Sequence, residues 1–165
     1  MGIFFQESFP SIIWQTSDPE SIHRKSIVSW INHQRLSSKM PEPLDIDVEK
    51  RPWPVTTQLK SFIKGIVCIN MIHISPWSCT RALFEESKSC LDHNQFLMLY
   101  GPFLRNGIQT SERNLIFDQS LKLQNPLWGL RHLDQVNEIA FENGFEQDKI
   151  IEMPTNNLSV VYRLN

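Results

Sequence analysis

Glycine is scarce in this sequence of 165 residues, which contains only six. None of the glycines stand in G-x-G-x-x-G or G-x-x-x-x-G-K spacing, with which a backbone turn cradles the phosphates of a nucleotide. A nucleotide bound by this sequence would lack its usual glycine cradle. A nicotinamide-dependent oxidoreductase, which also depends on that turn, is the least favoured function.

Cysteine is also rare, and its spacing argues against two kinds of cross-link. The three cysteines, Cys68, Cys79 and Cys90, are odd in number and form no C-x-x-C pair. The sequence therefore indicates neither a disulfide framework nor a zinc site, and we expect no bound metal. Cys68 belongs to an apolar run, and the other two share one stripe of a predicted helix, so we expect buried thiols.

Long apolar runs and clusters of basic residues are missing as well. No window approaches the roughly 18 apolar residues of a membrane helix, and residues 1–7 carry no basic leader. The 16 Lys and Arg residues are scattered among 18 Asp and Glu residues, for a net charge of −2. Binding to nucleic acid needs clustered basic side chains. We therefore expect a cytoplasmic protein without a membrane or nucleic-acid partner.

Strands and helices alternate along the chain, and the length favours a single domain over residues 1–165. Periodicity and capping signals predict helices over 2–8, 19–36, 76–91, 112–123 and 133–144, strands over 12–15, 43–48, 62–70 and 95–100, and a hairpin of 149–153 and 158–162. This order predicts a mostly parallel α/β sheet with an antiparallel edge, the outline of a class I methyltransferase (Rossmann-like) sheet.

Two polar residues stand where predicted strands end. Asn70 is the first polar side chain after a strand expected to be buried on both faces, and Ser75 with Pro76 predicts the start of the next helix. Asp18 lies between a strand and a helix that a Ser17/Glu20 capping box would begin. Ligands bind at the carboxyl ends of strands in such sheets. Asn70 is therefore a candidate ligand contact, and Asp18 is either a helix cap or a ligand contact.

Six runs carry a family resemblance: Trp14-Gln15-Thr16-Ser17-Asp18, Ile69-Asn70-Met71-Ile72-His73-Ile74-Ser75-Pro76, Leu99-Tyr100-Gly101-Pro102-Phe103, Ser111-x-x-Asn114-x-x-Phe117-Asp118, Asn125-Pro126-x-Trp128-Gly129-Leu130-Arg131 and Met153-Pro154-x-Asn156-Asn157. With them, nearly the whole chain resembles the S-adenosylmethionine-dependent methyltransferase family catalogued as domain of unknown function 938, the methyltransferase-like protein 26 type. The resemblance implies S-adenosylmethionine as cofactor.

The resemblance also implies roles for cofactor contacts. Asp18 resembles the acid that binds the ribose, and Asp47, followed by Val48, resembles the acid beside the adenine. Asn70 and Met71 resemble the turn that lies beside the methionine end of the cofactor. A carboxylate can accept hydrogen bonds from both ribose hydroxyls, which makes these roles chemically sound.

The sequence departs from the family at its start. Family members begin with a strand and a glycine-rich segment of the type Glu-x-Gly-Ser-Gly-x-Gly, and this chain has neither. We therefore expect an N-terminally truncated domain that lacks the middle strand of its sheet, and self-association through an unpaired strand edge. Two functions stay open: a methyltransferase, or a non-catalytic methyltransferase-like remnant that acts as a binding or regulatory partner.

The chemistry of methyl transfer needs positioning, and a base only where the acceptor has a proton to lose. His73 and Tyr100 are the candidate bases, although His73 can equally be structural. Residues 102–131 are expected to form a lid over the acceptor, a small molecule or a protein; the alternative is a packed surface insertion. The candidate acceptor contacts are Phe103, Asn114, Phe117, Asp118, Trp128 and Arg131, with Asn156 and Asn157 from the hairpin turn.

Overall fold

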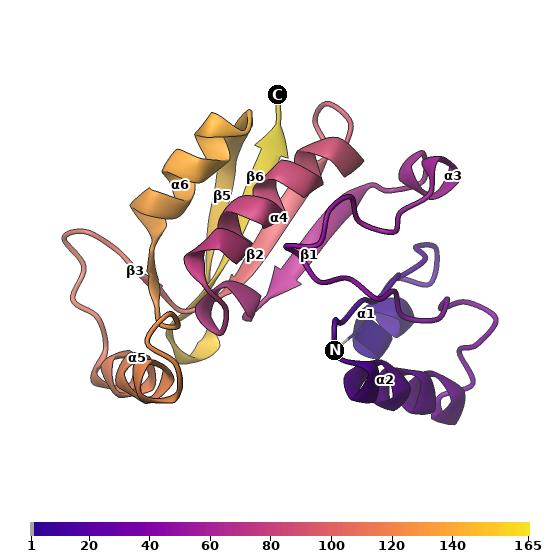
Figure 1. Cartoon of the computed structure of the whole chain (residues 1–165), viewed down its shortest axis with the longest axis horizontal. Helices are drawn as coiled ribbons and strands as arrows, with labels where there is room; N and C mark the ends of the chain where they lie inside the picture. The colour runs from indigo at the N-terminus through magenta and orange to yellow at the C-terminus, as the bar shows by residue number, and fades with distance from the viewer. Residues whose placement is uncertain (1) are drawn as a thin grey trace. The chain divides into compact units, whose positions relative to one another are not determined.

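A computed structural model describes residues 2–165 and divides into two compact units (Figure 1). The N-terminal unit ends at Pro54, and the C-terminal unit runs from Val55 to Asn165. The single domain expected from the length stays a prediction.

The N-terminal unit consists of two helices and the loops that connect them. Helix α1 is Gly2–Ser8 and helix α2 is Ser21–His33. The ring of Phe5 on α1 stacks on Trp14, with 4.6 Å between ring centroids. A single parallel bridge joins Ser17 to Leu44 and ties the segment before α2 to the segment after it.

The strands predicted over 12–15 and 43–48 were wrong. The buried side chain of Gln6 donates to the Ile12 carbonyl at 2.7 Å and accepts from the Trp14 amide at 3.0 Å. These backbone groups are therefore bonded to a helix side chain instead of a neighbouring strand. Around Leu44, pairing is confined to the Ser17 bridge.

The start of α2 also differs from the prediction. The helix begins at Ser21, its N-cap Glu20 makes no side-chain cap bond, and no capping box forms. Ile31 of this helix is buried, whereas Ile22 is 71% exposed. The first turn of α2 therefore lies at the surface of its unit.

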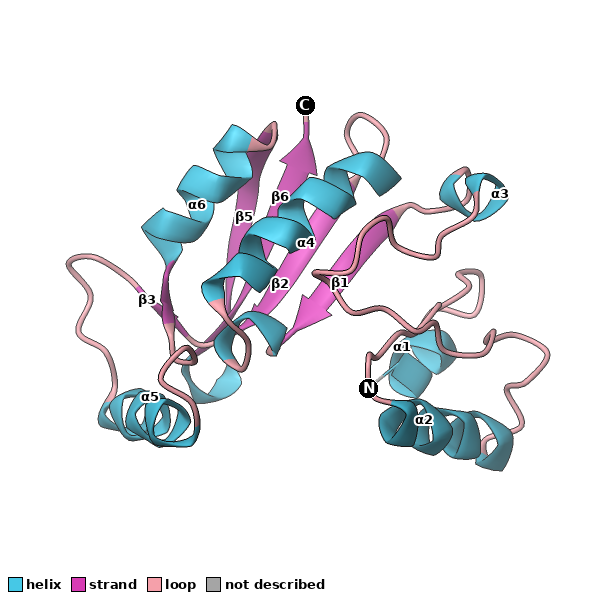
Figure 2. Ribbon diagram, in the orientation of Figure 1, coloured by secondary structure: helices cyan, strands magenta, loops and turns pink. Residues whose placement is uncertain are grey.

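The C-terminal unit contains the sheet and most of the helices (Figure 2). Its elements in chain order are α3 Thr57–Lys60, β1 Gly65–Ile69, a 3₁₀ turn Met71–His73, α4 Trp77–Cys90, β2 Phe96–Gly101, β3 Phe103–Leu104, α5 Glu112–Gln124, β4 Arg131–His132, α6 Leu133–Glu142, β5 Phe145–Met153, a 3₁₀ turn Pro154–Asn156 and β6 Asn157–Leu164. The predicted β2, α5, α6 and the terminal hairpin are confirmed.

The main sheet has four strands in the order β1-β2-β6-β5. Strands β1 and β2 are parallel, and β6 is antiparallel to both β2 and β5. The sheet is therefore mixed, whereas the sequence predicted it to be mostly parallel. A separate parallel pair joins β3 to β4. The predicted loss of a middle strand stays a prediction.

Helices α4 and α6 lie side by side against the sheet (Figure 1). Phe84 of α4 is fully buried, and its ring contacts Phe145 of β5 and Tyr162 of β6 at centroid distances of 5.6 and 5.3 Å. The side chains of Leu97 and Leu99 on β2 are buried, whereas the intervening Met98 is half-buried. In β1, Cys68 is buried and the other four residues are half-buried, so the expectation that this strand is buried on both faces was wrong.

The cysteines are buried as expected, and all three are free thiols. Burial raises the pKa of the Cys68 thiol to about 12, which keeps it protonated at neutral pH. Within residues 2–165, no helix is both long enough and apolar enough to cross a bilayer.

Candidate functional site

The corner after β1 presents one exposed polar side chain at the carboxyl end of a parallel strand. Asn70 has a left-handed backbone, with φ of 58°, and its side chain is exposed. Its amide donates to the Tyr100 carbonyl at 2.8 Å, and its carbonyl accepts from the His73 amide at 3.2 Å. Asparagine tolerates this conformation better than most residues. The corner is therefore fixed by backbone bonds, which leave the carboxamide free for a ligand.

His73 lies directly beneath this corner and is almost completely buried, with 1% of its surface exposed. Neither ring nitrogen has a hydrogen-bond partner among residues 2–165. The ring meets Phe103 edge to face, with centroids 5.1 Å apart. Burial, helped by the positive charge of Arg131, lowers the pKa of His73 to about 3. The imidazole is therefore neutral at pH 7 and a weak base, so the predicted proton-abstracting role gives way to a packing role.

The other candidate base, Tyr100, stands at the end of β2. Its hydroxyl accepts a hydrogen bond from the Asn157 side chain at 3.3 Å. Asn157 also donates to the Thr155 hydroxyl at 3.0 Å. The sequence-predicted residues Tyr100 and Asn157 are therefore in direct contact.

Arg131 connects the end of the 102–131 segment to the corner. Its Nε donates to the Ile72 carbonyl at 2.9 Å, and its Nη2 donates to the carbonyls of Ser75 at 2.6 Å and Leu127 at 2.8 Å. The guanidinium also lies over the Trp77 ring, 5.5 Å from its centroid. All of these groups are backbone or aromatic, so Arg131 acts as a structural clamp.

Three further predicted acceptor contacts lie on the same segment. The Asp118 carboxylate accepts from the Leu130 amide at 2.8 Å and pairs with Lys122. Phe117 is 40% exposed, and Trp128 is half-buried, with its amide bonded to the Asn125 carbonyl at 2.9 Å. Asp118 is therefore occupied in holding the turn before β4.

Ser75 does not cap α4 as predicted. Its hydroxyl donates instead to the Met71 carbonyl at 2.8 Å, and the helix begins at Trp77 with Pro76 as its N-cap. The sulfur of Met71 lies 3.2 Å from the same hydroxyl. Ser75 therefore closes the 3₁₀ turn that follows Asn70, and the sequence signal for a cap was wrong.

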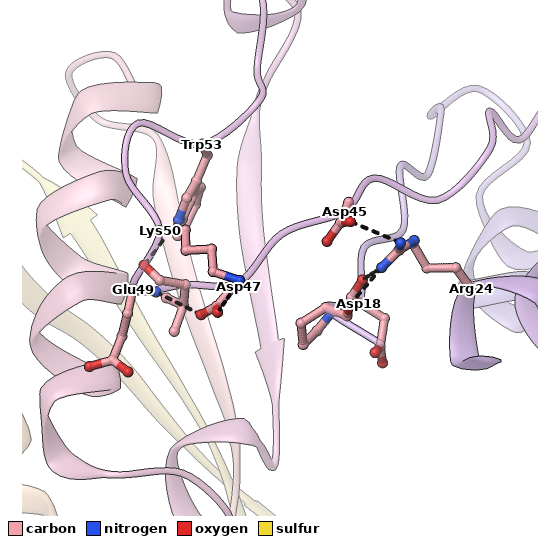
Figure 3. A network of polar contacts seen from close by, with 9 residues as sticks. Asp18, Arg24, Asp45, Asp47, Glu49, Lys50 and Trp53 are labelled. Carbon is pink, nitrogen blue, oxygen red and sulfur yellow. Dashed lines mark hydrogen bonds and ion pairs between the residues drawn. The ribbon is translucent and has the colours of Figure 1, made fainter. Parts of the chain in front are cut away.

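In the N-terminal unit, Asp18 and Asp45 meet at Arg24 (Figure 3). Arg24 donates to the Asp18 carbonyl at 2.8 Å and to the Asp45 carboxylate at 2.9 Å. The Asp18 carboxylate accepts from the Glu20 amide at 2.8 Å and lies 3.2 Å from His23. One carboxylate oxygen of Asp18 is therefore engaged in the turn that precedes α2, which favours a structural role over a ligand contact.

Asp47 lines an open pocket of about 620 Å³ within the same unit, together with Asp45 and Lys50. Its carboxylate accepts from the Glu49 amide at 3.2 Å and pairs with Lys50 at 3.3 Å (Figure 3). The Val48 carbonyl accepts from the Trp53 indole at 3.3 Å. A carboxylate has about four lone-pair sites, so Asp47 keeps acceptor capacity for a ligand.

A second cavity, of about 140 Å³, lies in the C-terminal unit between the start of α5 and the β5–β6 turn. It brings together Phe103, Asn114 and Asn156. The Asn114 side chain donates to the Asn156 carbonyl at 3.3 Å. Three of the predicted acceptor contacts therefore share one cavity.

Sequence reasoning missed two charged residues of this cavity, Arg105 and Glu152. They form an ion pair at 2.7 Å although 47 residues separate them in the chain. Neither belongs to a recognisable motif, and only the pairing of β5 with β6 places Glu152 beside the insertion. No signal in the sequence could have joined them.

Several solved structures share the fold of this chain. The LepI complex with S-adenosylmethionine matches with a TM-score of 0.75 and 13% identity over 99% of this chain and 40% of that chain. An O-methyltransferase family protein from Burkholderia thailandensis matches with 0.66 and 8% over 86% and 41%. Human N-acetylserotonin methyltransferase in complex with S-adenosylmethionine matches with 0.63 and 12% over 82% and 37%.

The chain spans less than half the length of each of these structures. At such identities the likeness establishes a fold, the mixed α/β fold of class I methyltransferases, and the expected fold class is confirmed to that extent. The family described as "Protein of unknown function (DUF938)" matches residues 1–164. The chain therefore belongs to the DUF938 family, as its sequence motifs predicted.

Proposed function

We propose that this chain binds S-adenosylmethionine and serves methyl transfer to an acceptor that is a small molecule or a protein. The observation that carries the proposal is the corner at Asn70, an exposed carboxamide held in a left-handed turn at the carboxyl end of a parallel strand. Ligands of open α/β sheets bind at this position. The methyltransferase-like fold of the structural neighbours supports the same assignment.

In the C-terminal unit, Asn70 and Met71 suit the methionine end of such a cofactor. The cofactor contacts that the family resemblance implies for Asp18, Asp47 and Val48 stay predictions. S-adenosylmethionine supplies a methyl group on a positively charged sulfur. The part of the chain is to bind, orient and exclude water.

A proton acceptor is needed only for acceptors that carry a removable proton. Tyr100 is our candidate, because its hydroxyl is oriented by Asn157 at the end of β2. His73 holds the corner in place as a neutral, buried ring.

Titration calorimetry with S-adenosylmethionine on the 165-residue chain tests the proposal. We expect saturable heat, and we expect Asn70→Ala to weaken binding by about tenfold, the cost of a hydrogen bond to a charged ligand group. Asn94→Ala is the matched control, because Asn94 is also exposed with a left-handed backbone, φ of 66°.

Absence of heat at millimolar cofactor would reject cofactor binding. The chain would then be better described as a non-catalytic member of the family that acts as a binding or regulatory partner. Equal losses in Asn70→Ala and Asn94→Ala would trace the effect to backbone strain and reject the contact.

A further inference from the structure

The cavity between α5 and the β5–β6 turn carries one positive and one negative side chain. Nη1 of Arg105 pairs with the Glu152 carboxylate at 2.7 Å, and the exposed fractions of the two side chains are 26% and 67%. Within residues 2–165, the Nε and Nη2 groups of Arg105 donate no hydrogen bond. A half-buried guanidinium with free donors is suited to a carboxylate, which it can bind through two parallel bonds.

The start of α5 strengthens this preference for an anion beside Arg105. The helix has 13 residues, and the side chain of its N-cap Ser111, which lines the cavity, accepts from the Asn114 amide at 3.3 Å. That bond satisfies one of the free amides of the first turn and leaves others without an intrahelical partner. The partial positive charge of the helix start therefore adds to that of Arg105.

Asn114 provides a hydrogen-bond acceptor, in contrast to the donors of Arg105 and the helix start. Its side chain is 7% exposed, and its Nδ2 donates to the Asn156 carbonyl at 3.3 Å. Its Oδ1 accepts no hydrogen bond from residues 2–165. Asn114 lines the cavity and this oxygen is not among the fully buried atoms that lack a partner, so a ligand in the cavity can supply the donor. With the Glu152 carboxylate, this oxygen is suited to an ammonium group.

The rest of the wall sets the size and the apolar part of the ligand. Phe103 and Leu158 are 6% and 2% exposed and form an apolar side of the cavity. A volume of about 140 Å³ is close to the roughly 150 Å³ cavity that accommodates benzene. The ligand is therefore small, with a short aliphatic substituent.

From these features we infer that the cavity is a binding site for a small zwitterionic amino acid with a short aliphatic side chain. The carboxylate faces Arg105 and the start of α5, the ammonium faces Glu152 and Asn114 Oδ1, and the aliphatic part lies on Phe103 and Leu158. A ligand with a single charge would pair with either Arg105 or Glu152 and leave the other without a partner. A zwitterion replaces the Arg105–Glu152 ion pair with two ion pairs, one to each side chain. The inference concerns binding, and it is independent of whether the chain binds S-adenosylmethionine.

Three related probes distinguish the charges. L-valine carries both groups, isovalerate lacks the ammonium, and isobutylamine lacks the carboxylate. In nitrogen-15 NMR spectra of the full chain, we expect L-valine to shift the side-chain resonances of Asn114 and Arg105 saturably, and the other two probes to bind at least about tenfold more weakly, the effect of losing one charged hydrogen-bonding group. No saturable shift with L-valine, or equal shifts with all three probes, overturns the inference.

Substitutions locate the site. Arg105→Gln and Glu152→Gln should each weaken L-valine binding about tenfold or more. Arg81→Gln and Glu142→Gln are the matched controls, because these residues form an ion pair at 3.2 Å outside the cavity, with 52% and 59% of their side chains exposed. Circular dichroism establishes that each variant is folded. Unchanged affinity in Arg105→Gln and Glu152→Gln, or losses as large in the controls, overturns the assignment.

The two proposals of this protein fail separately. Cofactor calorimetry addresses Asn70, and amino-acid titration addresses Arg105, Glu152 and Asn114. Heat with S-adenosylmethionine but no shift with L-valine would reject only the cavity assignment. The reverse result would reject only cofactor binding.

Discussion

The imidazole of His73 is buried without a hydrogen-bond partner in the described chain, and this makes folding sensitive to acid. Its pKa falls from an ordinary value of 6.5 to about 3, first because of burial and second because of Arg131. Below pH 6.5 this histidine therefore binds a proton in the unfolded chain but not in the folded chain. The contribution of the neutral His73 to the free energy of unfolding is fully present above pH 6.5 and is lost as the pH falls toward 3.

His73→Leu should remove most of this dependence. Because neither nitrogen is satisfied, replacing the ring with an apolar side chain should change the free energy of unfolding at pH 7 by only about 1 kcal/mol, in either direction. Between pH 6.5 and 4 the variant should become progressively more stable than the native chain, by about 1.4 kcal/mol per pH unit at most. Urea titrations at several pH values measure this. His93→Gln, which removes an exposed imidazole, should keep the native slope, and the same slope in His73→Leu would contradict the prediction.

Gly101 is required because its backbone approaches the His73 ring. A Cβ at this position would lie 2.5 Å from His73 Nε2 and 3.0 Å from Asn70 Oδ1. Gly101→Ala should therefore destabilise the chain by about 3 kcal/mol, because the buried ring has no space to move. Gly107→Ala is the control, since its added Cβ meets nothing within 4 Å and only the positive φ of 73° opposes it, at about 1 kcal/mol. Equal losses of stability in thermal melts would refute the steric explanation.

At the scale of elements, the Arg131 clamp joins the end of the 102–131 segment to the corner after β1. Arg131→Gln removes donors from the carbonyls of Ile72, Ser75 and Leu127. We expect a loss of about 2–3 kcal/mol in the free energy of unfolding, together with faster amide exchange at Gly129, whose amide donates to the His73 carbonyl at 2.9 Å. Arg163→Gln, which breaks an ion pair with Asp148 at 2.8 Å on the hairpin, should leave exchange at Gly129 unchanged. Native exchange at Gly129 in Arg131→Gln would show that the clamp is dispensable.

Elements with a strong internal period were the ones that sequence could predict. Strand β2, helices α4 and α6 and the hairpin are built from local alternation or amphipathic spacing, and they appear where expected. The segments around Ile12 and Leu44 fail because the side chain of Gln6 and the single bridge to Ser17 decide their backbone bonds. Such tertiary bonds leave no periodic trace in the chain.

Some residues of the candidate site could likewise be predicted from the sequence, and others could not. The position of Asn70 at a strand end could be predicted from the apolar run before it, and Asn114, Phe103 and Asn156 do share a cavity. Arg105 and Glu152 could not, because their contact depends on the register of distant strands. The predicted roles of Arg131 and Asp118 as acceptor contacts ignored the backbone groups that both residues bind. Those roles stay untested, and the bonds favour structural ones.

At the scale of the whole molecule, the two edges of the main sheet differ in charge. Strand β5 carries Glu146, Asp148, Lys149 and Glu152, whereas β1, with the sequence GIVCI, has no charged residue. Within residues 2–165, β1 pairs only with β2. Charged side chains oppose edge-to-edge pairing, and apolar edges permit it.

We therefore propose that β1 mediates self-association. Sedimentation velocity over a range of concentrations should show oligomers that Val67→Lys suppresses, because a lysine on an edge strand opposes pairing. Ile151→Lys is the control, since Ile151 lies on β5 and is already 47% exposed. A monomer at all concentrations, or equal suppression by both substitutions, would exclude β1 as the contact.

Phe103 has a consequence that reaches beyond packing. The Phe103 ring packs against the His73 ring, with 5.1 Å between ring centroids. Phe103 also lines the cavity that we assign to an amino acid. Aromatic rings shift the magnetic environment of their neighbours, so any molecule that tilts Phe103 changes the proton resonances of an imidazole it never touches. His73 is thus a built-in spectroscopic reporter, through which occupancy of the cavity can be followed from the interior of the protein.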